Sequence, residues 1–169
     1  MSNEAFYYVD GQPTKGAWCD LESVTEDDIK EVLADAGVIE RNEDGEIEYD
    51  GDLLVADVDG DLARCFLGKH GTFDLDGFHE ANDFVNSRGG PDEAAVVAYI
   101  NWRGSFSQSD FEDSYQGEYE DEESFAESIV DDLYNIPDSL QGYIDYEKFA
   151  RDLFMGDYYY EDGHVFRNT

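Results

Sequence analysis

Short apolar and aromatic runs in the first third of the chain predict three strands. They are Phe6–Val9, Gly16–Cys19 and Leu53–Ala56, which are rich in aromatic and aliphatic side chains and are bounded by Asp or Gly. This part of the chain is therefore expected to mix short strands with helix.

A helical period separates the second and third of these strands. Apolar side chains recur at spacings of three and four from Ile29 to Ala36, and Gly37 ends the pattern. Thr25 can cap this helix, with Asp28 at its third position as in a capping box. The opposite face is acidic, and its first-turn acids also suit the positive end of a helix. That face carries Glu26, Asp27, Glu31 and Asp35.

Two more helices are predicted between Asp61 and Arg103. The first has an apolar stripe of Phe78, Ala81 and Val85, and the second opens at Pro91 after a Gly-Gly pair. Three carboxylates on the first helix, Asp76, Glu80 and Asp83, are spaced by four and three and share one side. Like charges at this spacing oppose helix formation by a few tenths of a kcal/mol per pair, so this side is either simply solvated or used for its charge.

The last third of the chain begins with its densest acidic run. Aromatic residues interrupt this run at Phe111, Tyr115 and Tyr119, which gives it material to pack and distinguishes it from a polyacidic tail. The acids of the run are Asp110, Glu112, Asp113, Glu118, Glu120, Asp121, Glu122 and Glu123.

A helix, a second helix and a hairpin are predicted to follow. The first helix has an inward stripe of Phe125, Ile129 and Leu133, with Glu127, Asp131 and Asp132 outward. The second spans Asp145–Phe154. Tyr158–Tyr160 and His164–Phe166 then form a closing hairpin around Glu161-Asp162-Gly163.

The balance of charge adds a strongly negative surface to this pattern. The chain of 169 residues has 43 Asp and Glu against 10 Lys and Arg, for a formal charge of -33, so most carboxylates must face water or a basic partner. A content of 41% hydrophobic and 15% aromatic residues supports a folded core rather than disorder. A basic DNA-binding role is excluded. A dimer would carry twice this charge, which matches roughly 110 Å of duplex at one charge per about 1.7 Å.

No catalytic, metal or cofactor site is expected. Cys19 and Cys65 form no CxxC or Cys/His pattern and are predicted to be buried, reduced thiols. His70, His79 and His164 lack metal-ligand spacing, and there is no phosphate-binding loop or nucleophile elbow. The amino terminus has no basic segment followed by a long apolar run, and no apolar stretch reaches 18 residues, which predicts a cytoplasmic protein without a membrane anchor.

The acidity is also compatible with calcium binding or with a saline habitat. Asp57-Val58-Asp59-Gly60 and Asp74-Leu75-Asp76-Gly77 resemble pieces of a calcium-binding loop, although neither completes its ligand positions. Adaptation to a saline cytoplasm would also enrich Asp and Glu, and a DNA mimic could be directed at another DNA-binding protein. An acidic calcium-binding or salt-adapted interaction protein is therefore the alternative function.

The carboxy-terminal motifs resemble one known family. The run Ile136–Phe154 contains the pattern YIDYExxARDL, and Gly156-Asp157-Tyr158 and Gly163–Phe166 follow it. Together with Gly16-Ala17-Trp18 near the start and Tyr115–Tyr119, these residues make the chain similar to the ArdA antirestriction proteins over nearly its whole length.

This resemblance implies an α+β fold in an elongated chain of three small domains. The boundaries expected here are 1–60 for a mixed sheet and helix domain, 61–103 for a helical domain, and 104–169 for a second mixed domain with the dimerisation surface. It also implies a homodimer that imitates DNA and occupies the DNA-binding groove of a type I restriction-modification enzyme, at its specificity and methyltransferase core. Such an inhibitor binds protein rather than nucleic acid and protects incoming mobile-element DNA.

The residues expected to carry this role fall into two sets. The dimer contact is expected around Phe125, Ile129 and Leu133, where apolar residues are dense. The carboxylates expected to stand in for phosphates are Asp27, Asp28, Glu31, Asp35, Asp76, Glu80, Asp83, Asp110, Glu112, Asp113, Glu118, Glu120, Asp121, Glu122, Glu123, Asp131 and Asp132.

Overall fold

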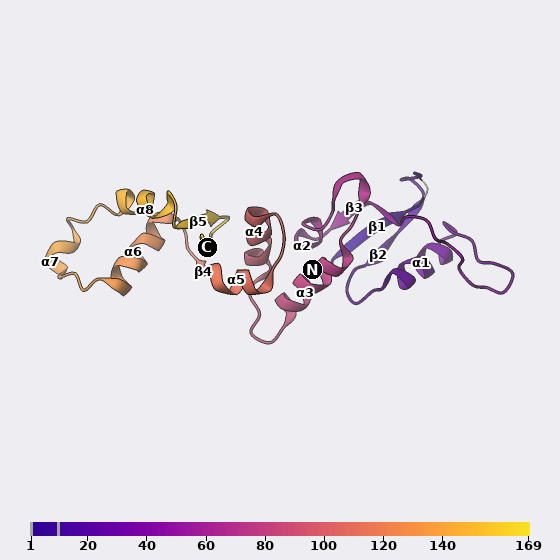
Figure 1. Ribbon diagram of the computed structural model, residues 1–169, viewed down its shortest axis with the longest axis horizontal. Helices are drawn as coiled ribbons and strands as arrows, with labels where there is room; N and C mark the ends of the chain where they lie inside the picture. The colour runs from indigo at the N-terminus through magenta and orange to yellow at the C-terminus, as the bar shows by residue number, and fades with distance from the viewer. Residues whose placement is uncertain (1, 10) are drawn as a thin grey trace. The chain divides into compact units, whose positions relative to one another are not determined.

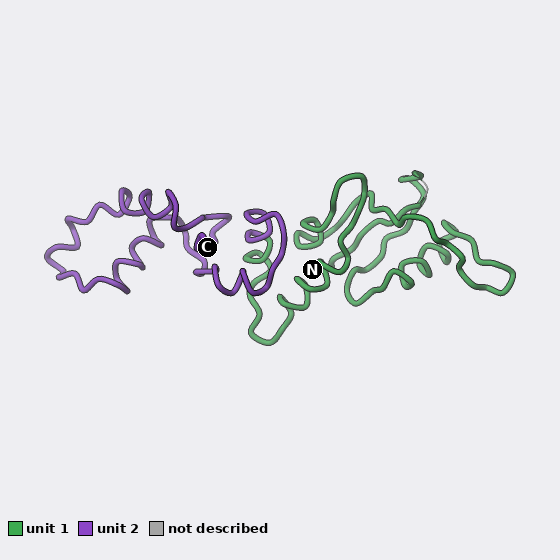
Figure 2. Tube along the Cα trace, in the orientation of Figure 1, with its two compact units in different colours: residues 1–97 green, residues 98–169 purple. Residues whose placement is uncertain are grey.

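Two small antiparallel sheets and a set of helices make up the computed structural model, which describes residues 2–9 and 11–169. The fold is therefore α+β, as predicted (Figure 1). The chain divides into two compact units, residues 1–97 and 98–169 (Figure 2). The finer division into three domains stays a prediction.

The sheet of the first unit has the strand order β2-β1-β3. Its strands are β1 (Glu4–Tyr8), β2 (Gly16–Asp20) and β3 (Leu54–Asp59), which confirms the three predicted strands to within a few residues. Ala5 and Tyr7 on β1 are buried, whereas Glu4, Phe6 and Tyr8 alternate with them and are half-buried. One face of the sheet therefore meets the core and the other is partly exposed.

Helix α1 (Glu26–Asp35) covers the core face of this sheet, with Ile29 and Leu33 buried. The predicted capping box is present, because the Thr25 side chain accepts a hydrogen bond from the Asp28 backbone N–H and the Asp28 carboxylate accepts one from the Thr25 backbone N–H. The predicted end of the helix at Gly37 is also confirmed. Gly37 has φ +72°, a conformation that a residue without Cβ adopts freely.

A helical segment completes the first unit. It contains α2 (Asp61–Arg64), a short 3-10 turn η1 (Lys69–Gly71), α3 (Leu75–Asn86) and the start of α4 (Glu93–Arg103). Phe78 lies at the centre of the segment, with its ring 6.0 Å from that of Phe66 and 6.1 Å from that of Phe73. The Phe73 ring also lies 6.5 Å from Tyr7 of the sheet, so strands and helices share one core.

The second unit is built on a sheet of order β4-β6-β5. Its strands are β4 (Tyr115–Glu118), β5 (Tyr158–Glu161) and β6 (His164–Arg167). The predicted hairpin is confirmed, and both turn residues, Asp162 and Gly163, have positive φ, at +47° and +88°. Two central residues with positive φ are typical of a type I′ turn, which matches the twist of the strands it joins.

Along the chain, α5 (Gln108–Ser114) precedes β4, and α6 (Glu122–Leu133), α7 (Asp138–Gln141) and α8 (Tyr146–Phe154) follow between β4 and β5. α6 packs against α8, with Phe125, Ala126 and Val130 buried. The expectation that Leu133 faces inward is wrong, since its side chain is 69% exposed. Leu133 lies on the last turn of α6, beyond the buried residues of that helix. The next helix, α7, has no buried residue and so does not pack over it.

Two aromatic clusters form the core of the second unit. In the first, Tyr99 packs its ring 5.5 Å from Phe111 and 5.8 Å from Phe166. In the second, Phe125 lies 5.0 Å from Tyr119 and 4.8 Å from Tyr158. Aromatic rings bury large areas without adding charge, which suits a chain with so many carboxylates.

The α1 capping box can be tested by substitution. Thr25→Ala removes the acceptor for the Asp28 N–H and should lower the free energy of unfolding by about 1 kcal/mol. Urea denaturation followed by circular dichroism measures this loss, with Thr25→Ser as the control that keeps the hydroxyl. An unchanged Thr25→Ala midpoint would contradict the role of the cap.

Candidate functional site

The carboxylates of the described chain lie at its surface. None of the described Asp and Glu residues is buried, and all except Glu4, Glu93 and Glu161 are exposed. Every carboxylate predicted to replace a phosphate is in the exposed group. An array of this kind presents negative charge to any molecule that approaches it.

On α1, part of the predicted charge is neutralised within the chain. The Arg41 guanidinium lies 2.6 Å from the Glu31 carboxylate and 2.8 Å from that of Asp35. These partners raise the pKa of Arg41, with Glu31 the larger cause. Exposed ion pairs of this kind contribute about 0–1 kcal/mol and weaken in salt, so a strongly basic partner can compete for both carboxylates.

On α3, the three predicted carboxylates remain without an ion pair in the described residues. Asp76 lies in the first turn, where negative charge suits the helix dipole. Glu80 and Asp83 follow on the exposed side, whereas Phe78 and Ala81 are buried. The predicted separation of the charged and apolar sides is thus present.

The acidic run of the second unit is divided among α5, β4 and α6. Asp110, Glu112 and Asp113 lie on α5, and Glu118 ends β4. Asp121 is the N-cap of α6, where its carboxylate accepts the Ser124 backbone N–H at 2.7 Å. The run is therefore built into secondary structure.

The end of α6 carries charge that the helix itself does not favour. Asp131 and Asp132 lie in its last three residues, and the last turn has no basic residue. The carboxyl end of a helix is the negative end of its dipole, so an acid there costs about 0.3–1 kcal/mol. Helix stability does not explain these two carboxylates.

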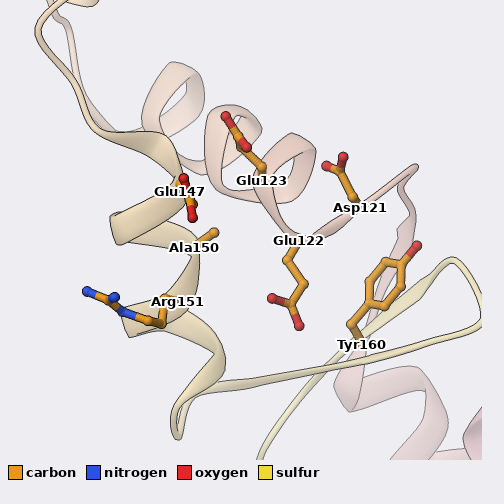
Figure 3. Close-up of a pocket in the computed structure, with 7 residues that line it drawn as sticks. All are labelled: Asp121, Glu122, Glu123, Glu147, Ala150, Arg151 and Tyr160. Carbon is orange, nitrogen blue, oxygen red and sulfur yellow. The ribbon is translucent and has the colours of Figure 1, made fainter.

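A pocket of about 500 Å³ lies between α6, α8 and β5 (Figure 3). Asp121, Glu122, Glu123, Glu147, Ala150, Arg151 and Tyr160 line it. No ion pair joins Arg151 to these carboxylates in the described residues, and in Figure 3 its guanidinium extends away from Glu122. Four carboxylates against one guanidinium leave this pocket with a net negative charge.

Sequence reasoning missed the α8 and β5 sides of this pocket. Glu147 and Arg151 are one helical turn apart on α8 and belong to the YIDYExxARDL pattern. Tyr160 donates its hydroxyl hydrogen to the backbone carbonyls of Glu120 at 2.8 Å and Tyr119 at 3.2 Å, which ties β5 to the connection before α6. Only the tertiary fold brings these segments to Asp121.

Two of the residues considered for metal binding or catalysis, Asp74 and His164, make contacts that stabilise the fold. Asp74 caps α3 through the Gly77 backbone N–H at 3.0 Å, so this calcium-like segment serves as a helix start. Across residues 2–9 and 11–169, no three His, Cys, Asp or Glu side chains gather closely enough to hold a metal ion. His164 is buried, with its Nδ1 3.0 Å from the Tyr115 hydroxyl.

The two cysteines are free and are not activated. Cys19 is buried, as predicted, whereas Cys65 is only partly buried. Burial raises the pKa of Cys19 to about 11, and burial followed by the nearby Asp61 charge raises the pKa of Cys65. Both thiols therefore stay protonated near neutral pH and are poor nucleophiles. Within the same described ranges, no helix is both long and apolar enough to cross a membrane.

Comparison with protein-family models assigns the chain to the antirestriction proteins, with a match over residues 5–166. The matching family is described as antirestriction protein (ArdA), and the chain belongs to this family, which confirms the resemblance of its carboxy-terminal motifs. The family consists of inhibitor proteins rather than enzymes, and it points to restriction-modification enzymes as partners. Comparison with curated proteins gives no match.

The α6 cap makes one of the acidic residues sensitive to pH. Hydrogen bonds from Ser124 lower the pKa of Asp121 below its ordinary 3.8, so the folded state binds this proton less tightly than the unfolded state. The resulting stability is present above about pH 4 and is lost as the pH falls through the lowered pKa. Asp121→Asn has no charge to titrate at this position.

We expect the difference in free energy of unfolding between wild type and Asp121→Asn to be constant from about pH 5 to 7 and to shrink below about pH 4. Chemical denaturation at each pH measures it. Asp131→Asn is the matched control, since Asp131 is exposed on the same helix but does not cap it. Identical pH profiles for the two variants would contradict the cap effect.

Proposed function

We propose that this protein inhibits a type I restriction-modification enzyme by occupying the DNA-binding groove of its specificity and methyltransferase core. The observation that carries this proposal is the exposure of every predicted phosphate-replacing carboxylate on a folded chain of the ArdA family. The protein acts in the cytoplasm, where it keeps incoming mobile-element DNA from the enzyme. No bond is made or broken.

The charge available for this contact is largely unneutralised by the chain itself. Of the 10 Lys and Arg in the sequence, Lys30 and Arg41 form the ion pairs seen in the described residues. A groove that binds DNA is positively charged, and a ligand with many fixed carboxylates releases the same counterions from it as DNA does. Electrostatic complementarity also speeds the encounter of the two proteins.

The placement of the acids favours this function over general solubility. Asp131 and Asp132 oppose the dipole of α6, whose last turn has no basic residue. Solubility needs net charge but no particular position. Charge retained where it weakens a helix is the pattern expected of residues that bind a partner.

The homodimer forms, in this proposal, through the surface around the end of α6. Of the residues predicted for the dimer contact, Phe125 is only 2% exposed and belongs to the core, and Ile129 is half-buried. The exposed apolar side chains are Leu133 at 69%, Tyr134 at 55%, Leu140 at 53% and Tyr143 at 86%. Apolar groups exposed in one stretch of chain are typical of a surface that a partner covers.

Competition for the methyltransferase core tests the proposed function. Saturating protein should displace a fluorescent duplex from the purified core, with an affinity that falls steeply as salt rises. Because many carboxylates share the energy, Asp131→Asn alone should change the inhibition constant by less than about twofold, whereas neutralising Glu122, Glu123, Asp131 and Asp132 together should weaken it by more than about tenfold.

The matched control neutralises the same number of charges elsewhere on the surface, at Glu40, Glu43, Asp44 and Glu46 after α1. It should weaken inhibition less than the α6 variant. Equal losses would show that only net charge matters. If saturating wild-type protein leaves the duplex bound, the proposed function fails.

The dimer surface is tested by Leu133→Glu. A charge at this exposed apolar position should convert a dimer to a monomer in sedimentation velocity at micromolar concentration without unfolding the chain. Val32→Glu places the same charge on an exposed apolar position of α1, where Val32 is 39% exposed, and should leave the dimer intact. A monomeric wild type, or a dimeric Leu133→Glu variant, would contradict the proposal.

A further inference from the structure

The outer face of the first-unit sheet combines an exposed tryptophan with carboxylates. Trp18 on β2 is 47% exposed although it lies in the middle of a strand. Its ring meets that of Phe6 on β1 edge to face, with centroids 5.6 Å apart, and the two residues are cross-strand partners. This contact holds one side of the indole, while nearly half of the Trp18 surface remains exposed.

An irregularity in β3 brings carboxylates to the same face. Val55 and Val58 are both buried although they are three residues apart, because the register of β1 and β3 shifts between Phe6 and Tyr7. The shift leaves Asp57 opposite Phe6, and Asp59 opposite Glu4. Without this bulge, strict alternation could not place Val55 and Val58 inward together with both aspartates outward.

These residues line a pocket of about 470 Å³ on the exposed side of the sheet. The lining consists of Glu4, Trp18, Asp57, Val58, Asp59 and Arg64. Three carboxylates against one guanidinium leave the pocket negative. Within the described ranges, neither Arg64 nor any other cation forms an ion pair with them or stacks on Trp18.

We infer that this pocket binds an arginine side chain of the protein partner, with the guanidinium over the Trp18 indole and its N–H groups donated to Glu4, Asp57 and Asp59. The inference rests on the proposed function, because it assigns that arginine to the DNA-binding groove of the partner. It makes Trp18 an anchor of the contact, in addition to the dispersed carboxylates.

Arginine suits this pocket for two reasons. A planar guanidinium stacks on an indole and at the same time presents a fork of donors to carboxylates, whereas a lysine ammonium is a compact, strongly hydrated charge. The chain contains the same contact elsewhere, since the Arg103 guanidinium lies over the Trp102 ring with its central carbon 5.0 Å from the centroid. Trp102 has its cation within the chain; Trp18 presents the equivalent surface to a partner.

Fluorine NMR on protein labelled with 5-fluorotryptophan tests the pocket without the restriction enzyme. The two resonances of Trp18 and Trp102 are assigned with Trp18→Phe, and the probe is a hexa-arginine peptide titrated to saturation by calorimetry. The Trp18 resonance should shift and the Trp102 resonance should stay, while hexa-citrulline, which is uncharged but similar in shape, should move neither. An unmoved Trp18 resonance at saturation, or an equal shift with hexa-citrulline, overturns the inference.

Competition for the methyltransferase core then measures the anchor in the full complex. Trp18→Ala should weaken displacement of duplex DNA by roughly five- to tenfold, and Asp57→Asn with Asp59→Asn, which preserves side-chain shape, by a comparable factor. Glu43→Gln with Asp44→Asn removes two exposed charges outside the pocket and should have a smaller effect. Circular dichroism checks that each variant is folded. If Trp18→Ala does not fold, Trp18→Phe replaces it, because it keeps a ring against Phe6.

The outcomes separate this inference from the proposed function. If wild type displaces DNA and both the Trp18 and the Asp57/Asp59 variants match the Glu43/Asp44 control, the pocket is not an arginine site although the protein is still a DNA competitor. If wild type fails to displace DNA, the proposed function fails, and the hexa-arginine titration alone decides whether the pocket takes a guanidinium.

Discussion

Mutual repulsion among the carboxylates is the constraint on which the rest of this structure depends. With a formal charge of -33, the chain can fold only if its acids stay in water and its cores carry no net charge. Both units meet this requirement through aromatic packing, around Phe78 in the first and around Tyr99 and Phe125 in the second. The same requirement that keeps acids out of the core places them where a partner can meet them.

Features decided by neighbouring residues could be predicted from the sequence. The capping box of Thr25 and Asp28 and the Asp162-Gly163 hairpin depend on side chains and backbone within a few positions, and both are present. Exposure of the acids could be predicted too, because an unpaired carboxylate is too costly to bury. The family followed from the carboxy-terminal motif, and the family model matches residues 5–166.

Features decided by distant residues could not be predicted. Tyr115–Glu118 becomes a strand because it pairs with β6, whose residues come nearly fifty positions later, so its own pattern did not mark it. Leu133 shares a helical stripe with Phe125, but the spacing of apolar residues in α6 does not show how far the helix that packs against it, α8, extends. The β3 bulge and the pocket that it forms with Trp18 also depend on pairing between strands far apart in sequence.

The cap carboxylates differ from the other surface acids in how firmly they are held. Asp28 and Asp121 accept hydrogen bonds from backbone amides at the start of α1 and α6. A glutamate side chain without such a bond keeps more rotamer freedom. The positions of these two charges are therefore fixed by the helices that they cap, whereas the other surface carboxylates contribute a diffuse negative field. A cap charge cannot change its position unless the start of its helix changes with it. In each unit, the geometry of folding thus sets the position of at least one surface charge.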